Sequence, residues 1–180
     1  MQNKHSKHTE CLNDLMDYFI VTDIEQLHRF QEQEKLPNDL LTEFTTEETG
    51  DVAVSEGIIL PIRGIENLPY TVYFNESDVS VFHQLTGDIE LQQTGYRLHV
   101  QSGTLHLITM PNLRHWDRTR PLPKWKPKHH LENGWYSVTV FAGLIDQDGH
   151  QEPTIEFWLK ACPAKPQFMA DIAYGFNLTS

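Results

Sequence analysis

The sequence contains no window that approaches the roughly 20 apolar residues a membrane-spanning helix requires. Residues 1–9 also have no apolar stretch behind their charges, so we expect neither secretion nor membrane insertion and predict a cytoplasmic protein. Only two cysteines occur, Cys11 and Cys162, and they form no Cys-x-x-Cys pair. Neither a disulfide scaffold nor a thiolate zinc site is indicated, and we expect both thiols to be reduced and buried.

Motifs for nucleotide binding and nucleophilic catalysis are also missing. No P-loop, no Gly-x-Gly-x-x-Gly and no Gly-x-Ser-x-Gly elbow occurs. Asp146-Gln-Asp-Gly149 resembles the start of a calcium loop, but no glutamate stands at the closing position, so we interpret it as a hairpin turn. We therefore expect no cofactor and favour a protein that is not an enzyme.

Positive charge is scarce, because 14 Lys and Arg stand against 25 Asp and Glu, for a formal net charge of -11. Phosphate binding depends on clustered cations, so this balance argues against general nucleic-acid affinity and favours a basic protein partner. The charges are also segregated along the chain. Residues 32–56 carry eight carboxylates against Lys35 alone, whereas residues 114–128 carry six cations against Asp117.

Apolar spacing predicts short helices at the beginning of the chain. One helix is predicted behind Thr9 from the positions Leu12, Leu15, Met16 and Phe19. Thr22-Asp-Ile-Glu25 has the form of a capping box, which predicts a second helix that ends before Pro37. A further helical turn is predicted from Leu40, Leu41 and Phe44, before the pattern breaks at residues 47–50.

The periodicity then changes to two, which is typical of strands. Seven segments bounded by Gly, Pro and Asn show it: 57–62, 70–74, 88–91, 96–100, 104–110, 136–141 and 154–159. Pro61 lacks an N–H group, so its segment is predicted at an edge or a bulge. The predicted class is α+β and mainly β, with two short N-terminal helices before an antiparallel β-sandwich or curved sheet. We expect one domain over 1–180, with a helical segment at 9–46, a β body at 52–162 and a C-terminal segment at 163–180.

Two histidines could face each other across a predicted hairpin. A two-residue turn at Ser102-Gly103 would pair His99 with His106, with Cβ atoms about 5 Å apart, close enough to share one Zn²⁺. A third ligand would have to come from elsewhere, with His115, Asp117, His129 and His130 as candidates. No compact metal motif matches this spacing, so a plain polar face is the alternative interpretation.

Residues 111–133 are predicted to form a basic, exposed loop in which tryptophans stand among cations. Three interpretations remain open: contact with a protein partner, folding back onto the acidic segment, and binding of single-stranded nucleic acid. For partner contact we predict Trp116, Arg118, Arg120 and Trp125. A second predicted patch consists of Glu47, Glu48 and Asp51, for which a solvated helix surface is the plain alternative.

Residues 24–44, with Leu36-Pro37 between two helical stretches, resemble the opening of a family of immunity proteins that neutralise bacterial toxins. The Asn-Gly-Gly signature that would follow is missing, so the resemblance transfers no residue. Our leading hypothesis is a non-catalytic binding protein, an immunity-type or antitoxin-like inhibitor that occupies the groove of a basic bacterial enzyme. The alternatives are a metal-dependent enzyme or metal sensor built on His99 and His106, and a β-sandwich that binds a small ligand.

Overall fold

The computed structural model describes residues 4–9, 17–66, 68–124 and 126–176, which form two sheets and five helices. The five-stranded sheet has the order β1 (His5–His8), β4 (Thr71–Asn75), β9 (His150–Cys162), β8 (Gly134–Gln147) and β5 (Gly87–Val100). The four-stranded sheet has the order β3 (Ile59–Arg63), β2 (Tyr18–Thr22), β6 (Thr104–Thr109) and β7 (Lys128–His130). The helices are α1 (Ile24–Glu34), α2 (Leu40–Thr46), α3 (Glu48–Ser55), α4 (Val81–Gln84) and α5 (Met110–Arg114).

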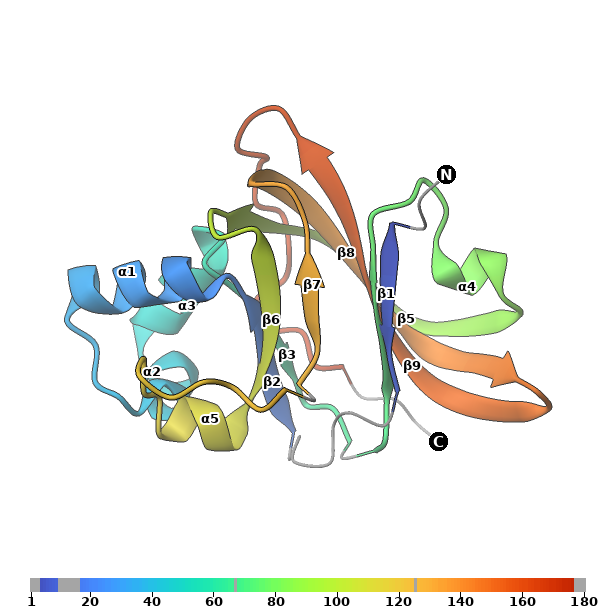
Figure 1. Cartoon of the computed structure of the whole chain (residues 1–180), viewed down its shortest axis with the longest axis horizontal. Helices are drawn as coiled ribbons and strands as arrows, with labels where there is room; N and C mark the ends of the chain where they lie inside the picture. Colours follow the sequence, from blue (N-terminus) through green and yellow to red (C-terminus); the bar gives the residue numbers. More distant parts are fainter. Residues whose placement is uncertain (1–3, 10–16, 67, 125, 177–180) are drawn as a thin grey trace.

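The two sheets pack on each other, and the helices cover their outer faces. Helices α1, α2, α3 and α5 gather beside the four-stranded sheet, whereas α4 lies on the far side of the five-stranded one (Figure 1). Phe19 of β2 contacts Phe157 of β9 edge to face at 6.3 Å, and Phe157 in turn stacks on Phe74 of β4. A β-sandwich fits this arrangement. None of the helices in the described part of the chain is long and apolar enough to span a membrane.

The helical part differs from the prediction in number and in extent. Most of the helix predicted behind Thr9 falls on residues 10–16, outside the described residues, and Phe19 lies in strand β2. The helix predicted after Thr22 is α1, and it ends at Glu34, before Pro37, as expected. The helical pattern does break at Glu47, which is extended and ends α2, but α3 begins at Glu48, so the change to strands expected from residues 47–50 is wrong.

The N-terminal cap of α1 is Asp23, not Thr22 as the capping box implied. The Asp23 carboxylate accepts from the Glu25 amide at 2.9 Å and, through its other oxygen, from the Gln101 and Ser102 amides at 2.6 and 2.8 Å. The Thr22 hydroxyl instead donates to the Ile58 carbonyl. Asp23 therefore holds the start of α1 against the connection between β5 and β6.

Most predicted strands exist, but two of them merge and one pair is parallel. Segments 88–91 and 96–100 belong to one strand, β5, whose pairing with β8 shifts register between Ile89 and Leu91 and again between Gln93 and Tyr96. Strand β4 pairs parallel to β9. The edge position of Pro61 is confirmed, because β3 is an outer strand of its sheet. The hairpin at 146–149 is also confirmed, since Gln147 pairs with His150 and the two residues between them have positive φ angles.

The hairpin predicted at Ser102-Gly103 is wrong. Strand β5 pairs with β8, whereas β6 pairs with β2 and β7 in the other sheet, so residues 101–103 connect the two sheets. The exposed loop predicted at residues 111–133 is also wrong in part, because this range contains most of α5 and all of β7, and Leu113 is fully buried. Cys162 is free and half-buried rather than buried, while Cys11 lies outside the described residues.

Candidate functional site

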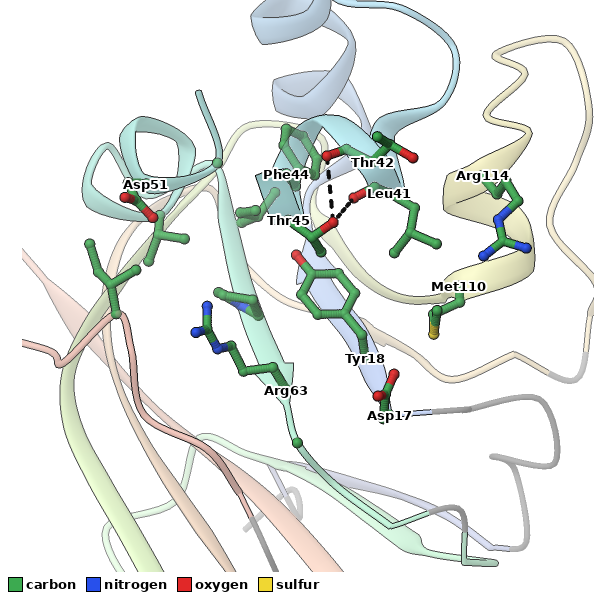
Figure 2. Close-up of a pocket in the computed structure, with 16 residues that line it drawn as sticks. Asp17, Tyr18, Leu41, Thr42, Phe44, Thr45, Asp51, Arg63, Met110 and Arg114 are labelled. Atoms are coloured by element: carbon green, nitrogen blue, oxygen red, sulfur yellow. Dashed lines mark hydrogen bonds between the residues drawn. The ribbon is translucent and has the colours of Figure 1, made fainter. Parts of the chain in front are cut away.

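A cleft of about 450 Å³ lies between the α2–α3 pair, α5 and the edge formed by β2 and β3. Gly50 makes the close packing of α2 and α3 possible, because a Cβ atom there would collide with the backbone of Phe44. In Figure 2 the Tyr18 ring occupies the middle of the cleft, with its hydroxyl directed toward α2 and with Arg63 and Arg114 on opposite sides. The cleft is thus framed by rigid elements and opens at the edge of a sheet.

The charged groups around this cleft are of both signs. Arg63 and Arg114 line it together with the carboxylates of Asp17 and Asp51. Burial raises the pKa of Tyr18 well above its ordinary value, against a smaller lowering by Arg63, so its hydroxyl stays protonated at neutral pH. A group held in one protonation state is a poor general base. The arrangement therefore suits binding of a polar, charged segment better than proton transfer.

Three of the predicted contact residues lie together beside this cleft. Glu47, Glu48 and Asp51 are exposed around the start of α3, and Asp51 lines the cleft itself. Val52, which follows Asp51, exposes 45% of its surface. We call these four residues the acidic rim. None of its three carboxylates forms an ion pair with another residue that the structure describes.

Other acidic residues of the 32–56 segment have partners within the protein. Glu32 pairs with Arg118 at 2.7 Å, and Glu56 pairs with Lys165 at 2.9 Å. Asp39 caps α2 by accepting from the amide and the hydroxyl of Thr42, and these bonds lower the pKa of Asp39. The three carboxylates of the acidic rim therefore remain without an ion pair among the described residues, as do Glu34 and Glu43.

The basic segment, residues 111–133, is only partly exposed to solvent. Trp116 is buried, with 5% of its surface exposed, so the expectation of an exposed contact residue is wrong for its ring. The burial arises because α1 packs against it: His28 lies 5.5 Å from it between ring centroids. Arg118 and Arg120 are exposed, and the pairing of Arg118 with Glu32 brings the basic segment back onto the acidic one. Trp125 lies outside the described residues.

The predicted metal site is not assembled. His99 stacks on Trp135 at 4.3 Å, and its Nδ1 atom accepts from the Gln26 amide at 2.7 Å. His106 lies in the other sheet, paired with Thr22 and Lys128, and His115 is exposed after α5. Among the described residues, no group of three or more His, Cys, Asp or Glu side chains is placed to hold a metal ion. The metal hypothesis depended on the hairpin at residues 102–103, and that hairpin does not form.

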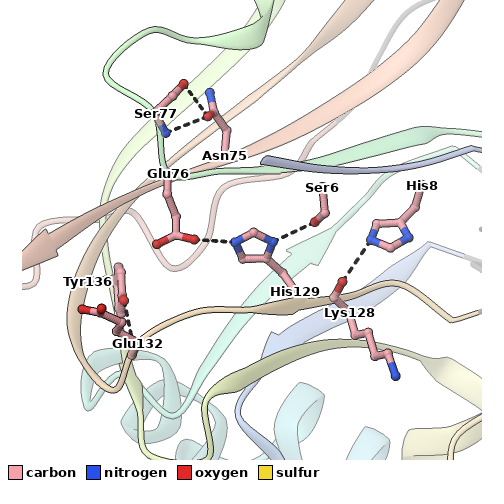
Figure 3. Close-up of polar contacts among 9 residues, drawn as sticks. All are labelled: Ser6, His8, Asn75, Glu76, Ser77, Lys128, His129, Glu132 and Tyr136. Atoms are coloured by element: carbon pink, nitrogen blue, oxygen red, sulfur yellow. Dashed lines mark hydrogen bonds and ion pairs between the residues drawn. The ribbon is translucent and has the colours of Figure 1, made fainter. Parts of the chain in front are cut away.

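A hydrogen-bonded array that the sequence did not suggest connects the edges of the two sheets (Figure 3). The Nε2 atom of His129 on β7 lies 2.8 Å from the Glu76 carboxylate, and its Nδ1 atom lies 2.8 Å from the Ser6 hydroxyl on β1. A carboxylate only accepts, so Nε2 carries the proton and donates, and in the neutral ring Nδ1 accepts from Ser6. No sequence signal could have grouped these three residues, because they are far apart in the chain.

The order serine, histidine, carboxylate is that of a hydrolytic triad, but the surroundings favour a structural role. His129 is buried and stacks on Phe74 at 5.6 Å with nearly parallel rings. Glu76 lines a surface cavity with Trp158, and neither Ser6 nor His129 lines that cavity. A nucleophile needs space for its substrate and donors for the developing oxyanion. The array therefore closes the sandwich by joining β1 to β7.

No protein-family model matches the chain, and no curated protein matches it in sequence. A solved structure with some likeness is the crystal structure of ComJ, inhibitor of the DNA degrading activity of NucA, from Bacillus subtilis. The two chains share 13% identity with a TM-score of 0.47, over 88% of this chain and 96% of that one. A likeness of this strength establishes neither a shared fold nor a shared activity.

The structural role of the array predicts a local effect on stability. Replacing His129 by leucine should lower the free energy of unfolding by about 2 kcal/mol, because it leaves the half-buried Glu76 carboxylate and the Ser6 hydroxyl without their partner. The matched control is His130→Leu, since His130 is exposed on the same strand. Urea unfolding of both variants measures the difference, and equal losses would contradict the role given to His129.

Proposed function

We propose that the protein is a non-catalytic, inhibitor-type binding protein that docks a basic protein partner on the acidic rim and the adjoining cleft. The observation that carries the proposal is the group of exposed carboxylates at Glu47, Glu48 and Asp51, which have no ion partner among the described residues and are followed by an exposed Val52. An immunity or antitoxin role in a bacterial cytoplasm, with a toxin or enzyme as the partner, is the specific form of this proposal.

Electrostatics supports a partner of positive charge. Like charges crowded on one surface repel each other, and a cationic partner relieves that repulsion while its approach is accelerated by the long-range attraction. The remainder of the molecule adds to the field, because the net charge is -11. A nucleic acid would be repelled by the same field.

The geometry of the rim supports a specific contact rather than a diffuse attraction. Val52 adds exposed apolar surface next to Asp51, and protein interfaces combine apolar contact with polar groups at the periphery. The cleft beside it can receive a polar segment of the partner, because its lining offers carboxylates at Asp17 and Asp51 as well as the guanidinium groups of Arg63 and Arg114. Helices α2 and α3 hold the rim in place, so little conformational entropy is lost on binding.

The test is binding to the product of the neighbouring gene, first by pull-down and then by calorimetry at low and high salt. We expect Glu47→Lys/Glu48→Lys to weaken binding roughly 10- to 100-fold, because each reversal replaces an attraction by a repulsion. Binding of the unmodified protein should weaken as salt is raised, because salt screens exposed charges.

The matched control is Asp88→Lys/Glu90→Lys, which changes the net charge equally at exposed positions of β5, away from the rim. This control should weaken binding only slightly. Equal weakening by the two double variants would mean that overall charge, and not the acidic rim, governs binding. A complex whose affinity does not change with salt concentration would contradict the electrostatic part of the proposal.

A further inference from the structure

A second cavity, of about 340 Å³, lies between α1, strands β6 and β7 and the segment that follows α5. Its lining has an unusual charge for so acidic a protein, because five cations border it against the single carboxylate of Asp117: Arg118, Arg120, Lys124, Lys126 and Lys128. The whole chain has 14 Lys and Arg, so about a third of them surround this cavity. We call it the cationic pocket.

One of these cations is not a surface residue. Lys126 is 4% exposed, and its Nζ atom donates to the Thr109 hydroxyl at 2.6 Å. Its ammonium group therefore lies in the wall of the pocket and not in solvent. Two of the five cations are already paired, Arg118 with Glu32 at 2.7 Å and Arg120 with Asp117 at 3.4 Å, and the other three that line the pocket are lysines.

Two buried polar atoms in the wall of the pocket have no hydrogen-bond partner among the described residues. They are Nε2 of His28, a residue with 8% exposure, and Nε1 of Trp116, a residue with 5% exposure, and both side chains line the pocket. A buried polar group without a partner is rare in folded proteins and costs free energy. The indole N–H can only donate, so its missing partner is an acceptor.

Burial and the nearby Arg118 lower the pKa of His28, which keeps this imidazole neutral at pH 7. A neutral imidazole can present Nε2–H as a second donor beside the indole N–H. Both atoms are covered in this conformation, so small rotations of the two rings are needed to bring them to a ligand. Apolar surface completes the lining at Ile24, Leu122 and the prolines 121 and 123.

We propose that the cationic pocket binds a small organic phosphate, with the phosphoryl group facing the lysines and the N–H groups of Trp116 and His28, and with the organic part against the apolar wall. The volume is that of a small-molecule site. Phosphate oxygens are strong acceptors and carry the negative charge that a lining rich in lysine and arginine favours. The pocket is separate from the acidic rim, so the proposal is independent of partner binding there.

The test uses a nucleoside monophosphate, inorganic phosphate and the uncharged nucleoside as three probes of the full-length protein. We expect the monophosphate to bind, inorganic phosphate to bind more weakly and the nucleoside not to bind measurably. In a ¹H–¹⁵N spectrum, the Trp116 indole N–H signal, assigned through Trp116→Phe, should shift on titration while those of Trp135 and Trp158 stay unchanged. The Trp116→Phe variant keeps an aromatic ring but has no donor, so its affinity should fall roughly tenfold.

A second variant keeps the test decisive if Trp116→Phe does not fold. Lys124→Gln/Lys128→Gln removes two exposed cations of the pocket, and Lys4→Gln/Lys160→Gln removes two exposed cations elsewhere. The first pair should weaken monophosphate binding severalfold and the second should not. Binding of no phosphate probe, equal binding of the nucleoside, or equal weakening by the two lysine pairs would overturn the proposal.

Discussion

Replacing Glu156 by leucine is expected to lower the free energy of unfolding by about 3 kcal/mol, because it leaves three buried donors without their acceptor. Glu156 is fully buried on β9, under the start of α4. One carboxylate oxygen accepts from the Asn75 amide and the Val81 amide, each at 2.9 Å, and the other accepts from the Ser80 hydroxyl at 2.7 Å. The side chain thus fastens α4 and the preceding loop to the outer face of the five-stranded sheet.

The variant Glu156→Gln separates hydrogen bonding from shape. It keeps one acceptor oxygen but turns a donor toward the other partners, so its loss should lie between zero and that of Glu156→Leu. Glu90→Gln, at an exposed position of β5, is the control and should change stability by less than about 0.5 kcal/mol. Guanidinium unfolding measures all three variants. If Glu156→Leu were as stable as the unmodified protein, the free-energy cost of burying the carboxylate would equal the stabilisation by its hydrogen bonds.

Replacing Asp23 by alanine is expected to cost about 3 kcal/mol. Loss of an N-cap costs about 1 kcal/mol, and the amides of Gln101 and Ser102 lose a charged acceptor at a part-buried position. Besides the free energy of unfolding, the amide hydrogen exchange of Gln101 and Ser102 should accelerate, because the carboxylate that protects them is gone.

The matched comparison is Thr22→Val, which removes the neighbouring hydroxyl while keeping the shape of the side chain. It should cost only about 1 kcal/mol, since that hydroxyl donates to the Ile58 carbonyl and does not cap α1. Asp23→Asn keeps the amide carbonyl as an acceptor and should lose less than Asp23→Ala. A larger decrease in the free energy of unfolding for Thr22→Val than for Asp23→Ala would support Thr22 as the N-cap and contradict the cap seen in the structure.

Local patterns predicted elements well where the element is defined by its own residues. The helix that ends before Pro37, the turn at residues 146–149 and the edge strand at Pro61 all follow from backbone chemistry within a few positions, and all three are present. The prediction failed where the partner of a strand had to be chosen. Alternation along residues 96–107 is satisfied equally by a hairpin and by two strands in different sheets, because it specifies which side faces the core and not which strand lies alongside.

The candidate sites divide in the same way. Glu47, Glu48 and Asp51 could be named from the sequence because charge on a short helical stretch stays at the surface, but their place beside a cleft depends on how α2 and α3 pack against β3. Trp116 was predicted to contact a partner because Lys and Arg residues lie near it in the sequence. Its ring is buried, because helix α1, which is distant in the sequence, covers it. No pattern in the sequence indicated the array formed by Ser6, Glu76 and His129.

The sequence by itself determined the strand-rich α+β class, the acidic balance and the separation of its charges, since composition and short-range periodicity carry that information. Only the tertiary structure decided that His99 and His106 belong to different sheets, that Asp23 rather than Thr22 caps α1, and that the basic segment encloses a pocket. The physical reason is that these outcomes depend on contacts between residues far apart in the chain, where packing of the whole core selects among pairings that are locally equivalent.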